Sequence, residues 1–329
     1  MIRSKAKISS GKIQDRHAAA DGVPMYYQPE YISAVAPCDT GSVPMFFEYD
    51  GTEGRCYYQF LLRPITIKNF EQYQDIVTPF DYGGFYYSDK SVLPVFFEEF
   101  VHFCKEMNIV SEFIRFCPVY SLNYEIIEKH ITTAHIADHY YVDLTSDYRL
   151  AFSKSRDRNI NRALSLDCFF SPSDTATFCG LYKQTMDRIG ANPYFYFPEQ
   201  VLNSLVDNGF AEIHSIGIGG RAYCSAVTLT DGDTAYYFLG GSLDTPEKND
   251  LNSLLFVRLF EKYQKEGVKT FFLGGGNRGV AEFKRRFTDK TVPYYIGRKI
   301  HDKEVYNELS ELNKNKDNSF FPAYREKII

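Results

Sequence analysis

The side chains best suited to chemistry in this sequence follow a glycine-rich turn near the C-terminus. Residues 274–276 are three glycines, and the string Phe283-Lys284-Arg285-Arg286-Phe287 comes shortly after them. A cation held in a dry site stabilises negative charge that develops on an oxygen atom during a reaction. Lys284 is therefore the first candidate for a catalytic group, with Phe283 beside it and Arg285 as a substrate-binding cation. The same string also fits an amphipathic helix whose basic face is simply solvated.

A second basic segment lies in the middle of the chain. Lys154, Arg156, Arg158 and Arg162 place four positive charges on little more than three helical turns. Such a cluster suits phosphate groups, whether of tRNA, coenzyme A or a nucleotide-linked acceptor. The alternative interpretation is a charged helix face that only meets solvent.

Two further segments supply candidates for binding and for proton transfer. The loop at residues 78–84 holds Asp81, a candidate general base, next to Tyr82 and Gly83 as substrate-binding residues. An aspartate in a loop also serves as an ordinary turn former. Tyr237, close to Gly240, can line an acceptor pocket or belong to a strand in the core.

The elements that must position these residues follow a repeated order. Apolar and aromatic runs at residues 43–49 and 55–64 predict a hairpin, and Pro94 opens a helix. In the second half, three strands precede a helix capped by Asn249 or Asp250, and then a strand, a short helix and a final strand follow. The first block reads β-β-β-α-β and the second reads β-α-α-β-β-β-α-β-α-β. This order predicts an α/β (α+β) fold with two related domains.

The predicted domain division falls between residues 146 and 147. Domain 1 is residues 1–146 and domain 2 is residues 147–329, and the tail at residues 302–329 is expected to pack back on domain 1. A chain of 329 residues suits two cores better than one.

Composition excludes several classes of protein. The net charge of −5 argues against a DNA-binding protein or a general nucleic-acid binder. Seven cysteines without a CxxC pair indicate reduced core residues in a cytoplasmic protein. No His, Cys or carboxylate set has the spacing of metal ligands, so we expect no metal. Residues 1–20 are too polar for a signal peptide, and we expect no membrane span.

The element order at residues 168–300 resembles the GNAT acyltransferase fold, and four strings resemble its Fem-like branch, which includes the aminoacyl-tRNA-dependent enzymes that build peptidoglycan interpeptide bridges. The strings are residues 152–163, 181–188, 273–287 and, more weakly, 78–84. The resemblance implies two tandem GNAT-like domains, each with a mixed, mostly antiparallel sheet flanked by helices, the first truncated and the second complete. It also implies an acceptor bound in the cleft between them, with Phe283 and Lys284 close to the reacting carbonyl.

The resemblance implies a transferase that moves an acyl or aminoacyl group to an amine of a cell-envelope or sugar- or peptide-linked acceptor. The acceptor would be a small molecule or linked to a lipid or a nucleotide, and the donor cosubstrate would be aminoacyl-tRNA or acyl-CoA, with no tightly bound cofactor. GNAT proteins bind the pyrophosphate of coenzyme A where a glycine-rich loop enters a helix. Here residues 240–250 carry acidic residues and a proline at that junction, so we expect no coenzyme A bound in the usual manner. A catalytically inactive GNAT-fold binding module is the alternative.

Overall fold

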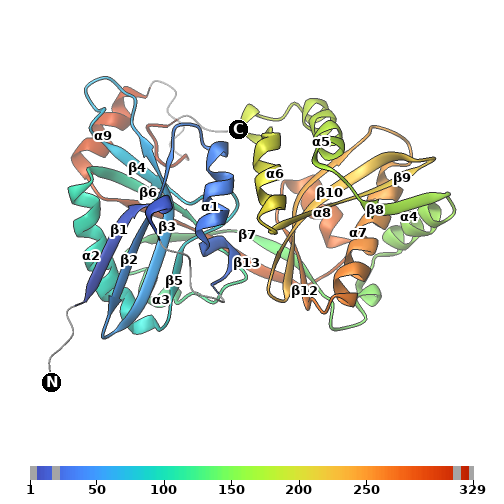
Figure 1. Cartoon of the computed structure of the whole chain (residues 1–329), viewed down its shortest axis with the longest axis horizontal. Helices are drawn as coiled ribbons and strands as arrows, with labels where there is room; N and C mark the ends of the chain where they lie inside the picture. The colour runs from blue at the N-terminus through green and yellow to red at the C-terminus, as the bar shows by residue number, and fades with distance from the viewer. Residues whose placement is uncertain (1–5, 17–22, 314–319, 326–329) are drawn as a thin grey trace. The chain divides into compact units, whose positions relative to one another are not determined.

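The computed structural model describes residues 6–16, 23–313 and 320–325, and the chain divides into two compact units (Figure 1). Unit 1 comprises residues 1–136 and 294–329, and unit 2 comprises residues 137–293. The sequence predicted one division, at 146/147, whereas the chain passes between the units twice. Both crossings lie within long strands, β7 (Thr132–Asp143) and β13 (Thr291–Ile300), so that no loop marks the place where the unit changes.

Unit 1 is a mostly antiparallel sheet in the order β1-β2-β3-β4-β6-β13, with β5 also paired to β3. Among the described residues of this unit, the parallel pair of strands is β4 and β6, and helix α2 lies between them in the chain. The other elements of unit 1 are β1 (Lys7–Lys12), β2 (Val43–Gly51), β3 (Gly54–Pro64), β4 (Gln74–Val77), β5 (Phe85–Tyr87), β6 (Ile109–Arg115), α1 (Pro29–Val35), α2 (Leu93–Glu106), α3 (Tyr124–Ile127) and α9 (Lys303–Leu312).

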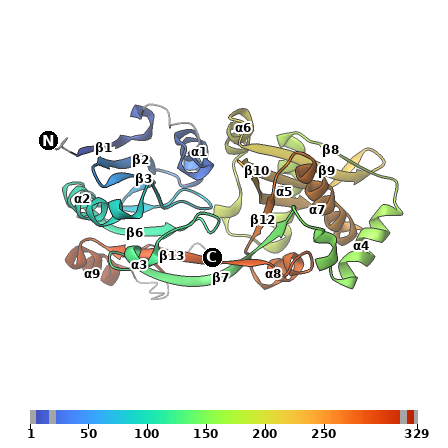
Figure 2. The ribbon, with the colours of Figure 1, turned by 90° about the horizontal axis from the view of Figure 1, so that it is seen from below.

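Unit 2 repeats this plan, with strands in the order β7-β12-β11-β10-β9-β8. The parallel pair of this unit joins β11 and β12, and helix α7 connects them. Both α7 and β12 are labelled in Figure 2. The other elements of unit 2 are α4 (Lys154–Leu164), β8 (Cys168–Pro172), α5 (Thr175–Ile189), α6 (Glu199–Asp207), β9 (Ala211–Ile218), β10 (Arg221–Asp231), β11 (Thr234–Ser242), α7 (Lys248–Lys265), β12 (Thr270–Gly274) and α8 (Arg278–Arg285). Three antiparallel strands, a crossover helix and a parallel strand thus occur in both units, which confirms the predicted mixed, mostly antiparallel architecture.

Each crossover helix supplies the core of its unit. Phe96, Phe100 and Phe103 of α2 lie one or more turns apart and pack against Phe47 and Phe60 of the sheet. In unit 2 the core consists of residues of α7, including Leu254 and Phe260, packed on strand residues such as Ala226 and Phe271. The three-and-four spacing of these apolar residues therefore has the same cause in both units, namely one helix face buried on a sheet.

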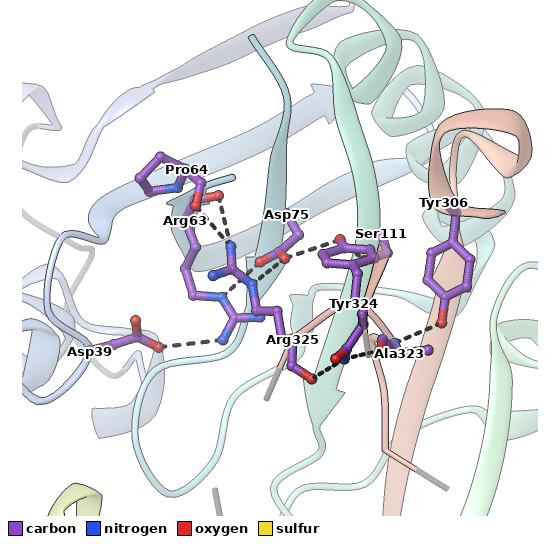
Figure 3. Close-up of polar contacts among 10 residues, drawn as sticks. Asp39, Arg63, Pro64, Asp75, Ser111, Tyr306, Ala323, Tyr324 and Arg325 are labelled. Atoms are coloured by element: carbon purple, nitrogen blue, oxygen red, sulfur yellow. Dashed lines mark hydrogen bonds and ion pairs between the residues drawn. The ribbon is translucent and has the colours of Figure 1, made fainter. Parts of the chain in front are cut away.

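The C-terminal residues attach to unit 1 through a buried carboxylate (Figure 3). Asp75 of β4 has no exposed surface, and its two oxygens accept from Arg63 Nε at 2.7 Å and Arg325 Nε at 2.6 Å. The hydroxyl of Tyr324 donates to the same carboxylate at 3.1 Å and lies 2.7 Å from Ser111 Oγ. This network fastens residues 320–325 to strands β3, β4 and β6.

Candidate functional site

Lys284 is buried in unit 2, although it lies in the most basic string of the sequence. Its side chain is 5% exposed, and its ammonium donates a hydrogen bond to the carbonyl of Gly275. Asn277 is the N-cap of helix α8, and its Oδ1 accepts from the amide of Val280 at 3.1 Å. This cap turns the chain back after β12, so that Lys284 lies over the glycine turn that precedes its own helix.

Near Lys284, the hydrogen-bonded pairing between strands β11 and β12 ends. β11 and β12 are paired only from Thr234–Tyr236 to residues 270–272, whereas β11 continues to Ser242. Tyr237, the first residue beyond the paired segment, has its ring centre 5.4 Å from Lys284 Nζ. Burial of its hydroxyl raises the pKa of Tyr237, so the phenol remains protonated at neutral pH. The parting of the two parallel strands therefore coincides with the buried cation.

Two glycines allow the close packing around Lys284. A Cβ on Gly275 would lie 2.4 Å from His139 Nε2, and a Cβ on Gly240 would lie 2.0 Å from the hydroxyl of Tyr237. Neither neighbour leaves room for a methyl group. The structure thus brings together Lys284, Tyr237 and Gly240 of the residues singled out from sequence, with Phe283 adjacent to Lys284 in α8.

His139 belongs to this group and was not among the candidates selected from the sequence. Its side chain is 6% exposed, and burial, followed by the charge of Lys284, lowers the pKa of His139 to about 4. The imidazole is consequently neutral at pH 7. The sequence holds no local signal for this contact, since His139 and Gly275 are far apart in the chain and meet only because β7 pairs with β12.

The four cations of α4 divide into two groups. Lys154, Arg158 and Arg162 are exposed at four-residue spacing, which places them on one helix face. Arg162 forms a bidentate pair with Asp250 of α7, at 2.7 and 2.8 Å. Arg156 faces the opposite way and is 2% exposed. Arg285 is exposed and pairs with Glu282 of its own helix at 2.7 Å.

Acidic side chains surround the start of α7, the position at which GNAT proteins bind pyrophosphate. Asp244, Glu247 and Asp250 lie there, and Lys248 pairs with Asp244 at 2.6 Å. The strand end before it is occupied by α5, because Ser242 exchanges hydrogen bonds with Thr185 at 2.8 and 3.1 Å. An anion at this helix start would meet negative charge, which opposes the favourable helix dipole.

Asp81, Tyr82 and Gly83 belong to unit 1, and the other predicted site residues belong to unit 2. Asp81 has a φ of 73°, and its Oδ2 accepts from the hydroxyl of Tyr26 at 2.7 Å. Arg115 holds this loop by donating to the carbonyl of Asp81 at 3.2 Å and to that of Thr78 at 2.7 Å. Tyr82 is 7% exposed, and Gly83 forms an isolated parallel bridge with Phe116.

A separate hollow of about 360 Å³ lies at the edge of the unit 2 sheet. It contains none of the residues selected from sequence. Its lining comes from β8, β9 and α7 and consists of Cys168, Phe169, Phe170, Ile216, Arg258, Glu261, Lys262 and Lys265.

Within residues 6–16, 23–313 and 320–325, no three His, Cys, Asp or Glu side chains are placed to hold a metal ion. In the same ranges, none of the helices combines the length and apolarity that a bilayer span requires.

Comparisons with known proteins agree with this architecture. Residues 152–285 match the family model of an acetyltransferase (GNAT) domain, a match that contains α4, α7 and Lys284. No curated protein matches the chain in sequence. Among solved structures, FemX is similar with a TM-score of 0.66 and 13% identity, covering 90% of this chain and 96% of that one.

Two other structures share the fold. L-PGS from Bacillus licheniformis has a TM-score of 0.53 and 13% identity, covering 74% of this chain and 83% of its own. A tandem GNAT protein from the clavulanic acid biosynthesis pathway has a TM-score of 0.50 and 8% identity, and the match covers 89% of this chain and 98% of that one. The predicted GNAT fold and the predicted likeness to Fem-type proteins are thereby confirmed.

Proposed function

Because residues 152–285 match a GNAT acetyltransferase domain, we propose that this acyltransferase moves an aminoacyl group from an activated ester to an amine, with Lys284 as the catalytic cation. The observation that carries the proposal is the burial of the Lys284 ammonium where β11 and β12 part. In this fold a strand end that lacks its neighbour leaves backbone groups available to a substrate. The proposed site therefore lies in unit 2, beside Tyr237 and Gly275.

The reaction would run through a tetrahedral intermediate. The acceptor nitrogen attacks the acyl carbonyl, negative charge develops on the carbonyl oxygen, and the bond to the donor oxygen or sulfur breaks as the amide forms. An ammonium in a poorly solvated site stabilises that oxygen more strongly than it would in water. Phe283 and Tyr237 restrict solvent around Lys284, and Gly240 gives the space that the Tyr237 hydroxyl occupies.

Proton removal from the acceptor amine needs a base. Asp81 remains the proposed group, on the evidence of its own loop in unit 1 alone. Its carboxylate is held by Tyr26, and its backbone is fixed by Arg115 in a conformation that side chains seldom adopt. Backbone strain of this kind is concentrated at functional positions. Tyr82 and Gly83, from the same loop, are proposed to contact the acceptor, for which we propose an amine on a sugar- or peptide-linked molecule of the cell envelope.

Aminoacyl-tRNA is the donor that the charge distribution favours. The acids at the start of α7 oppose the pyrophosphate of coenzyme A at its usual position. Lys154 and Arg158 are exposed on α4, and no carboxylate of the described residues pairs with either. These two cations are proposed to contact donor phosphates, whereas Arg162 and Arg285 are already paired with Asp250 and Glu282.

The experiment offers both donors to the full-length protein. Wild type is incubated with a mixture of aminoacyl-tRNAs or with acetyl-CoA, and with a lysine-containing peptidoglycan peptide or glucosamine as acceptor. Mass spectrometry of the acceptor should show an aminoacyl adduct. An acetyl adduct alone would contradict the proposed donor, and the absence of any adduct would favour a binding module without turnover.

A further inference from the structure

Arg156 makes contacts that differ in kind from those of the other α4 cations. Its guanidinium carbon lies 4.2 Å from the ring centre of Phe283 and 4.0 Å from that of Phe287. Its Nη2 donates to the carbonyl of Phe283 at 2.8 Å, and its Nη1 donates to the hydroxyl of Ser253. One side chain thus joins α4 to both α7 and α8.

The burial of this cation is costly. Among the described residues, no carboxylate forms an ion pair with Arg156, and its Nε is buried without a hydrogen-bond partner. Burial, followed by the charge of Arg286, lowers the pKa of Arg156 to about 9, and the guanidinium remains charged at pH 7. An apolar side chain of similar volume is often at least as stabilising as a charged one at a buried position. Packing alone therefore does not explain why residue 156 is an arginine.

The hydrogen bond to Phe283 explains what the arginine adds. The last carbonyls of a helix have no amide donor within the helix, and cations stabilise that end. At the end of α8, the amide of Phe287 bonds to the carbonyl of Lys284, and the carbonyl of Phe283 accepts from Arg156. The amide of Ser153 donates to the carbonyl of Arg286 at 3.0 Å. The first turn of α4 therefore caps the last turn of α8.

We propose that Arg156 is a positioning residue, which fixes the last turn of α8 so that the Lys284 ammonium stays on the carbonyl of Gly275 beside Tyr237. Lys284 directly follows Phe283, the residue that Arg156 holds by its carbonyl and its ring. A small rotation of α8 would carry the ammonium away from the site. The proposal rests on the proposed catalytic function of Lys284, and it differs from the sequence-based hypothesis that Arg156 binds a substrate phosphate.

Hydrogen exchange tests the positioning without any assay of activity. In Arg156→Met, the amides of residues 278–287 should exchange at least about tenfold faster than in wild type, because the cap is lost. Arg156→Lys keeps the charge but cannot bridge Ser253 and Phe283 equally well. The exchange rates of these amides in Arg156→Lys should therefore lie between those of wild type and those of Arg156→Met. Arg221→Met is the matched control, since Arg221 also lies over a ring, that of Tyr223 at 5.9 Å, but is exposed. Unchanged exchange of α8 in Arg156→Met would overturn the proposal.

A double-mutant cycle then tests whether Arg156 acts through Lys284. Arg156→Met should lower kcat by about tenfold to a hundredfold with little change in the KM of the donor. The double variant with Lys284→Met should have the same kcat as Lys284→Met alone. A raised KM of the donor at unchanged kcat would instead show that Arg156 contacts a donor phosphate. An equal loss of kcat from Arg156→Met in the wild-type protein and in Lys284→Met would show that Arg156 has a general structural role. A Lys284→Met variant as active as wild type would overturn the proposed function, while the exchange measurement would still decide the positioning.

Discussion

The carbonyl of Gly275 accepts a hydrogen bond from the ammonium of Lys284, a residue nine positions later in the chain. The backbone turn that ends β12 thus holds the side chain of the helix that follows it. A Cβ at Gly275 would also lie 2.4 Å from His139 Nε2. The cation, the turn and the imidazole therefore constrain one another, and a change at any of them should be measurable at the others.

Gly275→Ala should destabilise unit 2 by about 1–3 kcal/mol, because the added methyl group forces His139 or the turn to move. Gly279→Ala is the matched control, since its Cβ would only meet Asn277 Oδ1 at 3.6 Å within α8. Alanine at that helical position should be neutral or stabilise by up to about 1 kcal/mol. Chemical unfolding of both variants checks this, and equal stabilities would contradict the crowding at Gly275.

Gly240→Ala should destabilise the protein, because the new Cβ would lie 2.0 Å from the hydroxyl oxygen of Tyr237 and would collide with it. Tyr237→Phe removes that oxygen, so the double variant should be more stable than Gly240→Ala alone. The coupling free energy from the four unfolding curves should be about 1 kcal/mol or more. Additive effects would show that the hydroxyl does not fill this space.

The stability of the protein should fall in mild acid through His139. Its pKa is about 4 in the folded state and near 6.5 when unfolded, so the unfolded chain binds more protons between these values. The stabilising contribution is complete above pH 6.5 and is lost as the pH falls toward 4. Between pH 7 and 4.5, wild type should lose about 2 kcal/mol more than His139→Gln. Parallel stability curves for the two proteins would contradict a neutral, buried imidazole.

The C-terminal attachment to unit 1 should depend on Asp75. Asp75→Ala leaves the guanidiniums of Arg63 and Arg325 without their carboxylate and should cost about 3–5 kcal/mol. Arg325→Ala should cost less, because Arg63 still pairs with Asp75. Lys183→Ala breaks an exposed pair with Asp187 and should change stability by about 0.5 kcal/mol or less. Thermal unfolding should rank the three variants in that order.

Elements with a strong pattern were predicted well from sequence. The hairpin of β2 and β3 and the helix opened by Pro94 are both present. The predicted start of α7 was too late in the chain, because the helix begins at Lys248 with Glu247 as its N-cap, and the amide of Lys248 donates to the carbonyl of Thr245 at 3.2 Å. Strand β1 was missed, since its residues are mostly polar and exposed at a sheet edge.

The candidate site was only partly predictable. Local strings marked Lys284, Tyr237 and Gly240, which the structure brings together, because helix and turn signals are local. Whether a basic residue on a helix points outward or inward depends on tertiary packing, so Arg156 could not be separated from Lys154, Arg158 and Arg162. His139 and Ser253 gave no sequence signal, since their contacts join segments distant in the chain.

The most direct test of the account is the single-turnover rate of aminoacyl transfer by Lys284→Met at saturating donor. Lys269→Met is the matched control, since Lys269 is an exposed lysine of unit 2 paired with Asp233. The account predicts a rate about a hundredfold to a thousandfold below wild type for Lys284→Met, with donor affinity unchanged, and a normal rate for Lys269→Met. A transfer rate for Lys284→Met within twofold of wild type would contradict the catalytic role of the buried lysine.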